Sequence, residues 1–405
     1  MYSQDRRYYF ENIFFIVIQF LIVFVIVAKQ MEYGSDYLMH AQIAAEVSKN
    51  DILHFGRFLR EHSYILWQFL TKSLLVISNL SLKYAAAFVT ALCSSLLYIS
   101  SLIVFRKWCQ GVHIRETTRF HFLMFLVGPI YIPWYNEWVF RGQDSPNVWH
   151  NPTHFMVKPF AFIAFILIIW IVNKVKEYNY QKNISLFKAS ILAIVLVFAN
   201  LAKPSFTQIL YPALVVWMLW LLWESKGKAL KMGVQLACAC LPGFFLLIYQ
   251  FTSTFGDSSD GGGMKIAFME YWRMSSPNVA ISILLVISFP LVILCLAIYE
   301  KVGQEDLRLA WLMFLVGAVE KAMLIETGSR AAHGNFGWGY SLGCFFIWWV
   351  AVKYYLLLFW RKDISKKSWR FKEVFFCVTS VILILHLIGG VFYLYQLVTI
   401  PGFTC

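Results

Sequence analysis

The first residues suited to chemistry are an acidic residue and a histidine placed four residues apart, Asp36 and His40, directly after the first long hydrophobic segment. Ser35 is a typical helix N-cap, and on a helix that begins there, side chains at this spacing lie on one face. We therefore predict a catalytic pair at a membrane surface, with Asp36 as proton acceptor and Glu32 as the nearest competing carboxylate. In the alternative interpretation, the charge of Asp36 only complements the helix dipole, and His40 is a solvated neighbour.

Two lysines next to prolines form the second set of candidates. Lys158, followed by Pro159, lies four residues into one apolar segment, and Lys203, followed by Pro204, closes the next. A buried ammonium group is costly in hydrocarbon unless it lines a wet cavity or meets an anion. Each lysine alone could instead extend its amine to the lipid headgroups. Together with Arg330, they predict a cationic set suited to a lipid-linked phosphate or diphosphate.

Further polar candidates lie in hydrophilic loops between the apolar segments. His150 and His154 are also four residues apart, a spacing typical of two metal ligands on one helix. Pro152 interrupts a regular helix between them, however, and no third ligand lies nearby in the sequence. We therefore predict no metal-binding residues and no certain cofactor, and a divalent metal stays an open alternative. The predicted substrate-binding residues are His150, His154, Glu326, His333, Asn335 and Trp338.

The composition places all of these residues in a membrane protein. Of 405 residues, 60% are hydrophobic and only 14% are charged, a balance that excludes an ordinary soluble protein. The net charge of +13 does not indicate a nucleic-acid partner, because membrane proteins collect Lys and Arg in cytoplasmic loops and against anionic lipid. The eight cysteines show neither a disulfide framework nor a metal-binding spacing.

The apolar segments are long enough to predict a single all-α domain over 1–405 with about eleven transmembrane helices. The segment 62–80 is also apolar, but it carries Lys72 near its middle, and we expect it to lie in the membrane plane as an amphipathic helix. The predicted spans are 12–28, 84–105, 120–133, 155–173, 186–202, 206–223, 232–251, 279–299, 309–325, 339–360 and 374–396.

Charge distribution predicts the orientation of these spans. With 62–80 in the plane, one side of the membrane holds most of the 35 Lys and Arg residues on short connections, including 106–119 and 361–373. The positive-inside rule then places the N terminus in the cytoplasm and the C terminus outside. A Gly-rich stretch in one outer loop lacks the ending of a phosphate-binding loop and is read as a lid or connector. The predicted external loops are 29–83, which carries in-plane helices, 134–154, 252–278 and 326–338.

This architecture resembles the membrane-embedded glycosyltransferases of the C superfamily (GT-C fold), and the stretch from Gly34 to His40 is its sequence-level anchor. The shared features are a first span with its N terminus inside, a long first external loop that opens with an acidic residue, and in-plane helices within that loop. The resemblance implies a polyprenyl-phosphate or polyprenyl-diphosphate sugar donor, with Asp36 as general base on the acceptor. It also implies a second acidic residue from a later loop, here Glu137 or Asp144. The chain shows no large C-terminal soluble domain, so an asparagine acceptor is not expected.

The chemistry of such a donor needs few protein groups. A sugar on a lipid phosphate carries its own leaving group, so a base for the acceptor hydroxyl and cations for the departing phosphate are enough. We therefore predict a glycosyltransferase of a cell membrane, bacterial in preference to the endoplasmic reticulum, with a glycan, lipid or protein acceptor, membrane lipid as a further partner and no nucleic acid.

Two alternatives stay open. One is a polysaccharide polymerase or ligase of related architecture, although its expected large late external loop is short here, at 326–338. The other is a transporter or flippase of lipid-linked sugars, which would need ionisable residues near mid-membrane. Only Lys353 and His386 approach that position in the sequence.

Overall fold

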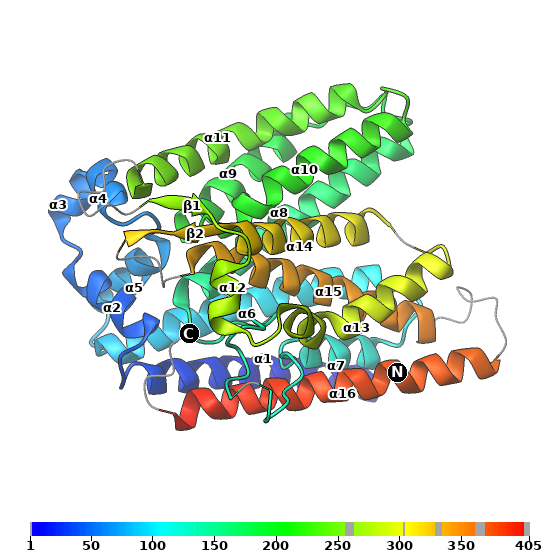
Figure 1. The fold of residues 1–405 in the computed structure, drawn as a ribbon, viewed down its shortest axis with the longest axis horizontal. Helices are drawn as coiled ribbons and strands as arrows, with labels where there is room; N and C mark the ends of the chain where they lie inside the picture. The colour runs from blue at the N-terminus through cyan, green and yellow to red at the C-terminus, as the bar shows by residue number, and fades with distance from the viewer. Residues whose placement is uncertain are drawn as a thin grey trace.

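The computed structural model of the chain describes residues 2–135, 137–255, 263–302, 304–328, 334–360 and 369–400. Within these ranges, eight helices are long and apolar enough to cross a membrane, which confirms an all-α, multi-pass membrane protein. They run side by side along the long axis of the molecule (Figure 1). These helices are α1 (Tyr2–Gln30), α6 (Leu82–Trp108), α8 (Pro152–Glu177), α10 (Ser205–Glu224), α11 (Leu230–Phe255), α13 (Val279–Tyr299), α15 (Trp338–Trp360) and α16 (Trp369–Thr399).

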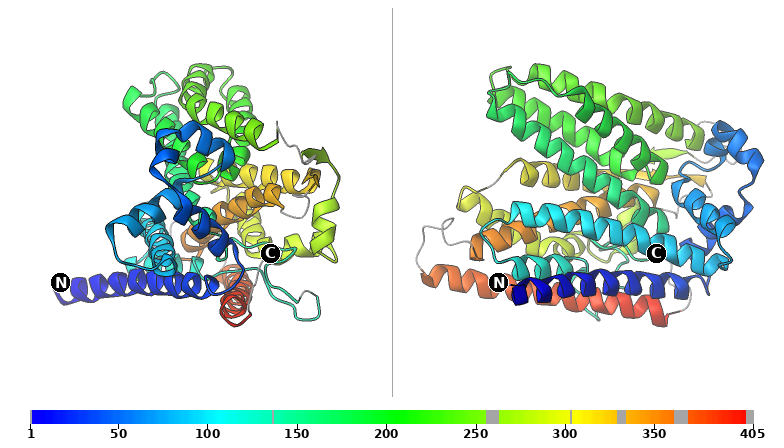
Figure 2. Two further views of the ribbon diagram at one scale, coloured as in Figure 1. Left: turned by 90° about the vertical axis from the view of Figure 1, so that its left-hand side faces the viewer. Right: turned by 180° about the vertical axis from the view of Figure 1, so that it is seen from behind.

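The predicted count of about eleven spans is not confirmed. Helix α9 (Leu186–Ala202) has 17 residues and is short for a crossing. Helix α14 (Glu305–Met323) is long enough but carries charged residues at both ends. Both lie alongside the eight apolar helices in each view (Figures 1 and 2).

The helix predicted over 120–133 does not form beyond Met124, where α7 (Ile114–Met124) ends. The described residues from there to Asn151, 125–135 and 137–151, form no helix or strand. Neighbouring helices supply the missing backbone partners: Gly128 N donates to His386 O at 3.0 Å, and Ile130 N donates to Leu285 O at 2.8 Å. Irregular backbone is tolerated at membrane depth where protein surrounds it in this way.

The first loop forms short helices at one end of the bundle, at the left of Figure 1. Helix α5 (Leu66–Ile77) has 12 residues, so it is about 18 Å long and too short to cross, as the sequence predicts for 62–80. The other short helices there are α2 (Asp36–Glu46), α3 (Lys49–Leu53) and α4 (Phe55–Glu61).

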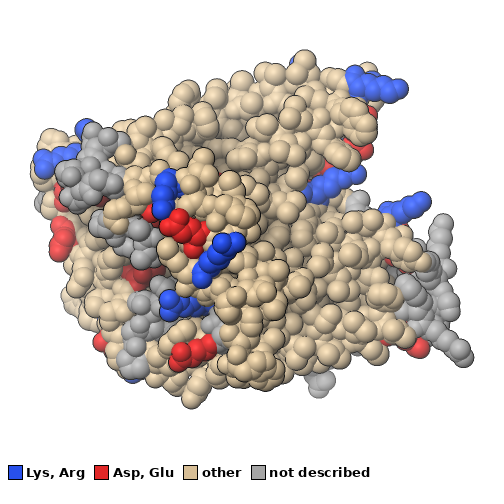
Figure 3. Space-filling view, in the orientation of Figure 1, with Lys and Arg blue, Asp and Glu red and all other residues tan. Residues whose placement is uncertain are grey.

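The same end carries a two-stranded antiparallel sheet of β1 (Met264–Ile266) and β2 (Leu324–Glu326), with Met264 opposite Glu326. Helix α12 (Glu270–Ser275) follows β1, and a 3₁₀ turn, η2 (Asn335–Gly337), leads into α15. Charged side chains on the face in Figure 3 gather toward the two ends of the bundle, with a band free of them between. Such a band is the surface that lipid hydrocarbon covers.

Helix α15 is the core of the bundle, buried from Gly339 to Leu358. It packs closely on α14, since a Cβ on Gly317 would lie 2.7 Å from the carbonyl carbon of Gly339. The residues that a transporter would use at mid-membrane have structural partners. Lys353 pairs with Asp306 at 2.7 Å, at the bundle end opposite the short helices.

His386 of α16 is likewise engaged by its neighbours. Its Nδ1 lies 2.7 Å from Gly128 O, and its Nε2 lies 2.8 Å from Ser288 Oγ. This ring therefore holds the irregular chain after α7 against α13 and α16.

Candidate functional site

Helix α2 begins as the sequence predicts, with Ser35 as its N-cap. The Ser35 hydroxyl accepts from Leu38 N at 3.3 Å and donates to Gln30 O at 2.8 Å, which ties the start of α2 to the end of α1. Tyr37 is fully buried and donates to Trp149 O at 3.0 Å. These contacts dock α2 onto the loop before α8 and place Asp36 beside Asn151.

The side chain of Asn151 bridges an acid and an amine. Its Nδ2 donates to Asp36 Oδ2 at 2.7 Å, and its Oδ1 accepts from Lys203 Nζ at 3.3 Å. The same Oδ1 caps α8 by accepting from His154 N at 2.9 Å. Because the cap fixes the amide, Asp36 and Lys203 are held close together without forming a direct ion pair.

Lys203 lies where α9 ends, in an extended backbone conformation before Pro204. Its ammonium donates to Thr153 Oγ1 at 3.0 Å and lies 4.2 Å from the ring of Trp338. The side chain is only 2% exposed. Burial lowers the pKa of Lys203 to about 7, although the nearby Asp36 acts in the opposite direction. An anion arriving at this amine would restore its charge.

A second acid and amine lie on the other side of the same space. Lys321 Nζ contacts Asp144 Oδ1 at 2.6 Å, and Ser341 Oγ donates to Asp144 Oδ2 at 3.0 Å. Asp144 has a positive φ of 62°, so the loop presents this carboxylate from a left-handed position. Both of its oxygens are therefore already engaged.

These two acid and amine sets line one cavity of about 350 Å³ at the end of the bundle that carries α2. The cavity brings together predicted residues from four separate parts of the chain, with Asn151 and Lys321 in addition. Its lining includes Asp36, His40, Asp144, Asn151, Lys203, Lys321, Asn335 and Trp338.

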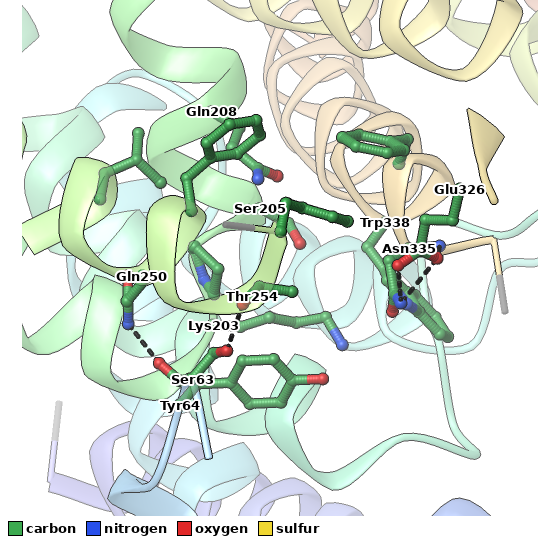
Figure 4. A pocket seen from close by; sticks show the side chains of 15 residues that line it. Ser63, Tyr64, Lys203, Ser205, Gln208, Gln250, Thr254, Glu326, Asn335 and Trp338 are labelled. Atoms are coloured by element: carbon green, nitrogen blue, oxygen red, sulfur yellow. Dashed lines mark hydrogen bonds between the residues drawn. The ribbon is translucent and has the colours of Figure 1, made fainter. Parts of the chain in front are cut away.

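A smaller apolar groove of about 60 Å³ opens beside Lys203 and shares Tyr64, Asn335 and Trp338 with the cavity. Figure 4 shows the Lys203 amine lying between the Tyr64 and Trp338 side chains. The predicted residue Glu326 lines this groove and accepts from Asn335 Nδ2 at 2.9 and 3.0 Å. The apolar lining includes Leu247, Phe251, Phe255 and Phe336.

Of the predicted histidines, His40, His150 and His154 are buried, and His40 and His150 have side-chain hydrogen-bond partners. His40 Nδ1 is hydrogen-bonded to Gln68 Nε2 at 2.9 Å, and burial lowers its pKa to about 4. His150 is hydrogen-bonded to Tyr393 Oη, and burial lowers its pKa to about 4 as well. Of these three, only His40 lines the cavity, while the ring centroid of His154 lies 5.8 Å from that of Trp338. Both His40 and His150 are therefore neutral near pH 7.

His150 and His154, whose spacing left a divalent metal as an open alternative, do not belong to a group of metal-ligating side chains within the part of the chain that the structure describes. Among the described residues, no group of three or more His, Cys, Asp and Glu side chains could hold a metal ion. His150 turns toward α16, since its partner there is Tyr393.

Two other predicted residues, Lys158 and Glu137, lie away from the cavity. Lys158 donates to Pro146 O at 3.1 Å and lies 4.9 Å from the ring of Phe345, so it does not join Lys203. Glu137 has an exposed side chain, and its backbone oxygen accepts from Gln396 on α16. Of the two later acids, the structure thus brings only Asp144 to Asp36. The predicted Arg330 and His333 lie outside the described residues.

Glu32, the competing carboxylate, also does not line the cavity. It pairs with Lys29 at 2.6 Å and with Lys83 at 2.7 Å. Hydrogen bonds from Lys29 and Lys83 lower the pKa of Glu32 to about 2, which makes it a weak proton acceptor.

Sequence reasoning missed Asn151, Tyr64 and Lys321. Asn151 carried a usable signal, because an Asn directly before a Pro is typical of a helix start. Gly334 at the cavity edge was missed as well: it has a φ of +62°, and a Cβ there would lie within 2 Å of Tyr271 Oη. Only a glycine fits beside that tyrosine.

No family model matches the chain, and no curated protein matches it significantly.

Proposed function

We propose that the protein is a membrane glycosyltransferase that moves a sugar from a polyprenyl-phosphate or polyprenyl-diphosphate donor to an acceptor hydroxyl. One observation carries the proposal: Asn151 holds the Asp36 carboxylate and the buried Lys203 amine on its two polar atoms, in a cavity joined to an apolar groove. A base, a cation and an apolar surface side by side match the three parts of the reaction, which are acceptor, phosphate and isoprenoid.

Asp36 is the better base of the two cavity acids. Its Oδ2 accepts from Asn151, and within the described part of the chain no residue donates to its Oδ1. Asp144 instead has a lysine on one oxygen and a serine on the other. We therefore assign Asp36 the proton transfer, and we assign Asp144 and Lys321 contacts with the sugar hydroxyls.

The proposed reaction is a single displacement. Asp36 takes the proton of the acceptor hydroxyl while the acceptor oxygen forms a bond to the anomeric carbon. The bond from that carbon to the phosphate oxygen breaks, and its electron pair stays on the phosphate. Lys203 balances the new negative charge, and the proton on Asp36 later passes to water. Attack opposite the phosphate would invert the anomeric carbon.

The apolar groove gives the donor lipid a place to lie. Leu247, Phe251 and Phe255 come from the end of α11, a helix with much of its surface exposed on the side of the bundle. An isoprenoid in the groove would put its phosphate at Lys203. The resulting ion contact would replace the cation–π contact with Trp338.

We also propose that the cavity end faces outward, with the N terminus in the cytoplasm and the C terminus outside. The bond between Gln30 and Leu397 O places the end of α1 beside the end of α16. The opposite end carries the basic last turns of two helices, which the positive-inside rule assigns to the cytoplasm. These residues are Arg106, Lys107, Lys174 and Lys176.

The direct test is to incubate the purified protein with radiolabelled polyprenyl-phosphate and polyprenyl-diphosphate sugars and to follow label into a water-soluble or lipid product. Transfer that depends on Asp36 supports the proposal. If no donor is turned over and polyprenyl phosphate does not bind, the proposed function is wrong.

A further inference from the structure

A third space opens from the central cavity on the side of the first loop. It is a cleft of about 260 Å³ that shares Met39, His40 and Tyr64 with the cavity. Arg60 and Glu61 are exposed at its rim. The cleft thus connects the surface of the loop to the helix face next to Asp36.

A hydrogen-bonded wall separates this cleft from the apolar groove. Ser63, Tyr64 and Thr254 line both spaces. The hydroxyls of Ser63 and Thr254 lie 2.6 Å apart, and Gln250 Nε2 donates to Ser63 O, as Figure 4 shows. The wall ties the loop before α5 to the last turns of α11, so the cavity has two side branches that do not merge.

The two branches differ in chemistry. The groove combines three phenylalanines, a leucine and a tryptophan with several polar side chains, whereas the cleft has none of those three residue types and is lined mainly by hydroxyl, amide, imidazole and charged groups. Gln68 and Ser253 supply neutral hydrogen-bonding groups inside the cleft. The lining holds one cation, Arg60, and one anion, Glu61, which contacts Arg57 at 3.1 Å. Both side chains are exposed, so solvent screens them and the cleft has no strong preference for a charged ligand.

We infer that this cleft is the acceptor site and that it binds a neutral, polyhydroxylated saccharide. Many small polar groups without net charge suit the hydroxyls of such a ligand, and Met39 and Tyr64 give its ring an apolar surface. A saccharide in the cleft would reach Asp36 along α2, across the wall of Ser63 and Thr254 from the groove. The inference rests on the proposed glycosyl transfer, and it names the acceptor class that the function leaves open.

The test is a binding experiment on the full-length purified protein with two kinds of probe, neutral glycosides and a lipid phosphate. Methyl glucoside, methyl galactoside and methyl N-acetylglucosaminide serve as neutral saccharides, followed by saturation-transfer NMR. Polyprenyl monophosphate serves as the lipid probe, followed by a change in tryptophan fluorescence. Ser253→Trp fills the cleft, and Thr252→Trp is the matched control, because Thr252 is exposed on the same helix and lines none of these spaces.

We expect at least one glycoside to bind the wild type and Thr252→Trp, and none to bind Ser253→Trp, while polyprenyl monophosphate binds all three proteins equally. Arg60→Ala, at an exposed rim position that does not endanger folding, should weaken glycoside binding roughly tenfold.

Two results would overturn the inference. Either no glycoside binds the wild type, or Ser253→Trp and Arg60→Ala both bind glycosides as tightly as the wild type does. If Ser253→Trp fails to fold, Arg60→Ala alone decides. If Ser253→Trp abolishes and Arg60→Ala weakens glycoside binding, the cleft is supported as a saccharide site. If polyprenyl monophosphate binds none of the proteins in the same experiment, the proposed lipid-linked donor is contradicted.

Discussion

The bundle carries buried charges at both ends, and the two ends treat them differently. At the end away from the cavity, Lys353 contacts Asp306 at 2.7 Å, and Lys176 contacts Glu305 at 2.6 Å. Tyr354 Oη completes the set by donating to Asp306 at 3.1 Å. These acids meet their cations directly.

At the cavity end, Asp144 and Lys321 also meet directly at 2.6 Å, but Asp36 and Lys203 lie on opposite sides of the Asn151 amide. The Asp36 carboxylate keeps one oxygen without a donor among the described residues, and the Lys203 amine is only partly charged near neutral pH because its pKa is about 7. Direct pairs hold helices together, whereas a separated acid and amine leave room for a ligand between them. Substitutions in the Asp36 and Lys203 set should therefore reduce activity, whereas substitutions in the Asp306 and Lys353 pair should reduce stability.

The largest expected effect is on turnover. Asp36→Asn keeps the shape of the side chain and its contact with Asn151 but removes the proton acceptor, so transfer should fall roughly 10²–10⁴-fold with little change in donor binding. Transfer of radiolabel from a polyprenyl-linked sugar measures this. Glu137→Gln, at an exposed position away from the cavity, is the control and should stay active. Near-normal transfer by Asp36→Asn, with loss in Asp144→Asn, would move the base to Asp144.

At the opposite end the expected loss is in stability. Lys353→Met leaves Asp306 buried without its cation and should lower the free energy of unfolding by about 3–5 kcal/mol. Denaturant titration in micelles measures the change. The double variant Asp306→Asn/Lys353→Met should recover most of the loss, since no uncompensated charge remains. A single variant as stable as the wild type would show that this pair does not hold α14 to α15.

Donor affinity should distinguish the two lysines that the sequence groups together. Lys203→Ala should weaken binding of polyprenyl phosphate by about 1.5–3 kcal/mol, the scale of a hydrogen bond to a charged group. Lys158→Ala should leave that affinity unchanged, because its amine is bonded to Pro146 O and lies outside the cavity. Equal losses in both variants, measured by fluorescence titration, would contradict this difference.

The smallest expected effect is a pH dependence of the same binding. The pKa of Lys203 is lowered to about 7, so the amine is mostly charged below that pH and mostly neutral above it. Polyprenyl-phosphate affinity should therefore fall roughly tenfold between pH 6 and 8. Lys203→Arg keeps its charge throughout this range and should remove the dependence. An unchanged slope in Lys203→Arg would assign the titration to another group.

Several features of the fold follow from local sequence alone. Long apolar segments determine the membrane class, because hydrocarbon excludes any chain that leaves its backbone groups unpaired. Ser35 determines where α2 begins, since its hydroxyl satisfies a free backbone amide in the first turn. That 62–80 forms no long membrane-spanning helix is predictable from the charge near its middle. The break after Met124 is not, because His386 and Leu285, far along the chain, supply its backbone partners.

For the site, the sequence alone identified Asp36, Asp144 and Lys203 as residue types suited to the chemistry. Only the tertiary structure decided that Asn151 joins Asp36, 115 positions earlier, to Lys203, 52 positions later. The tertiary structure also decided that Lys158 bonds to Pro146 O, away from Asp36 and Lys203, and that Lys321 pairs with Asp144. The physical reason is that capping and hydrophobicity act over one or two helical turns, whereas the distance between an acid and an amine on different helices depends on how every intervening helix packs.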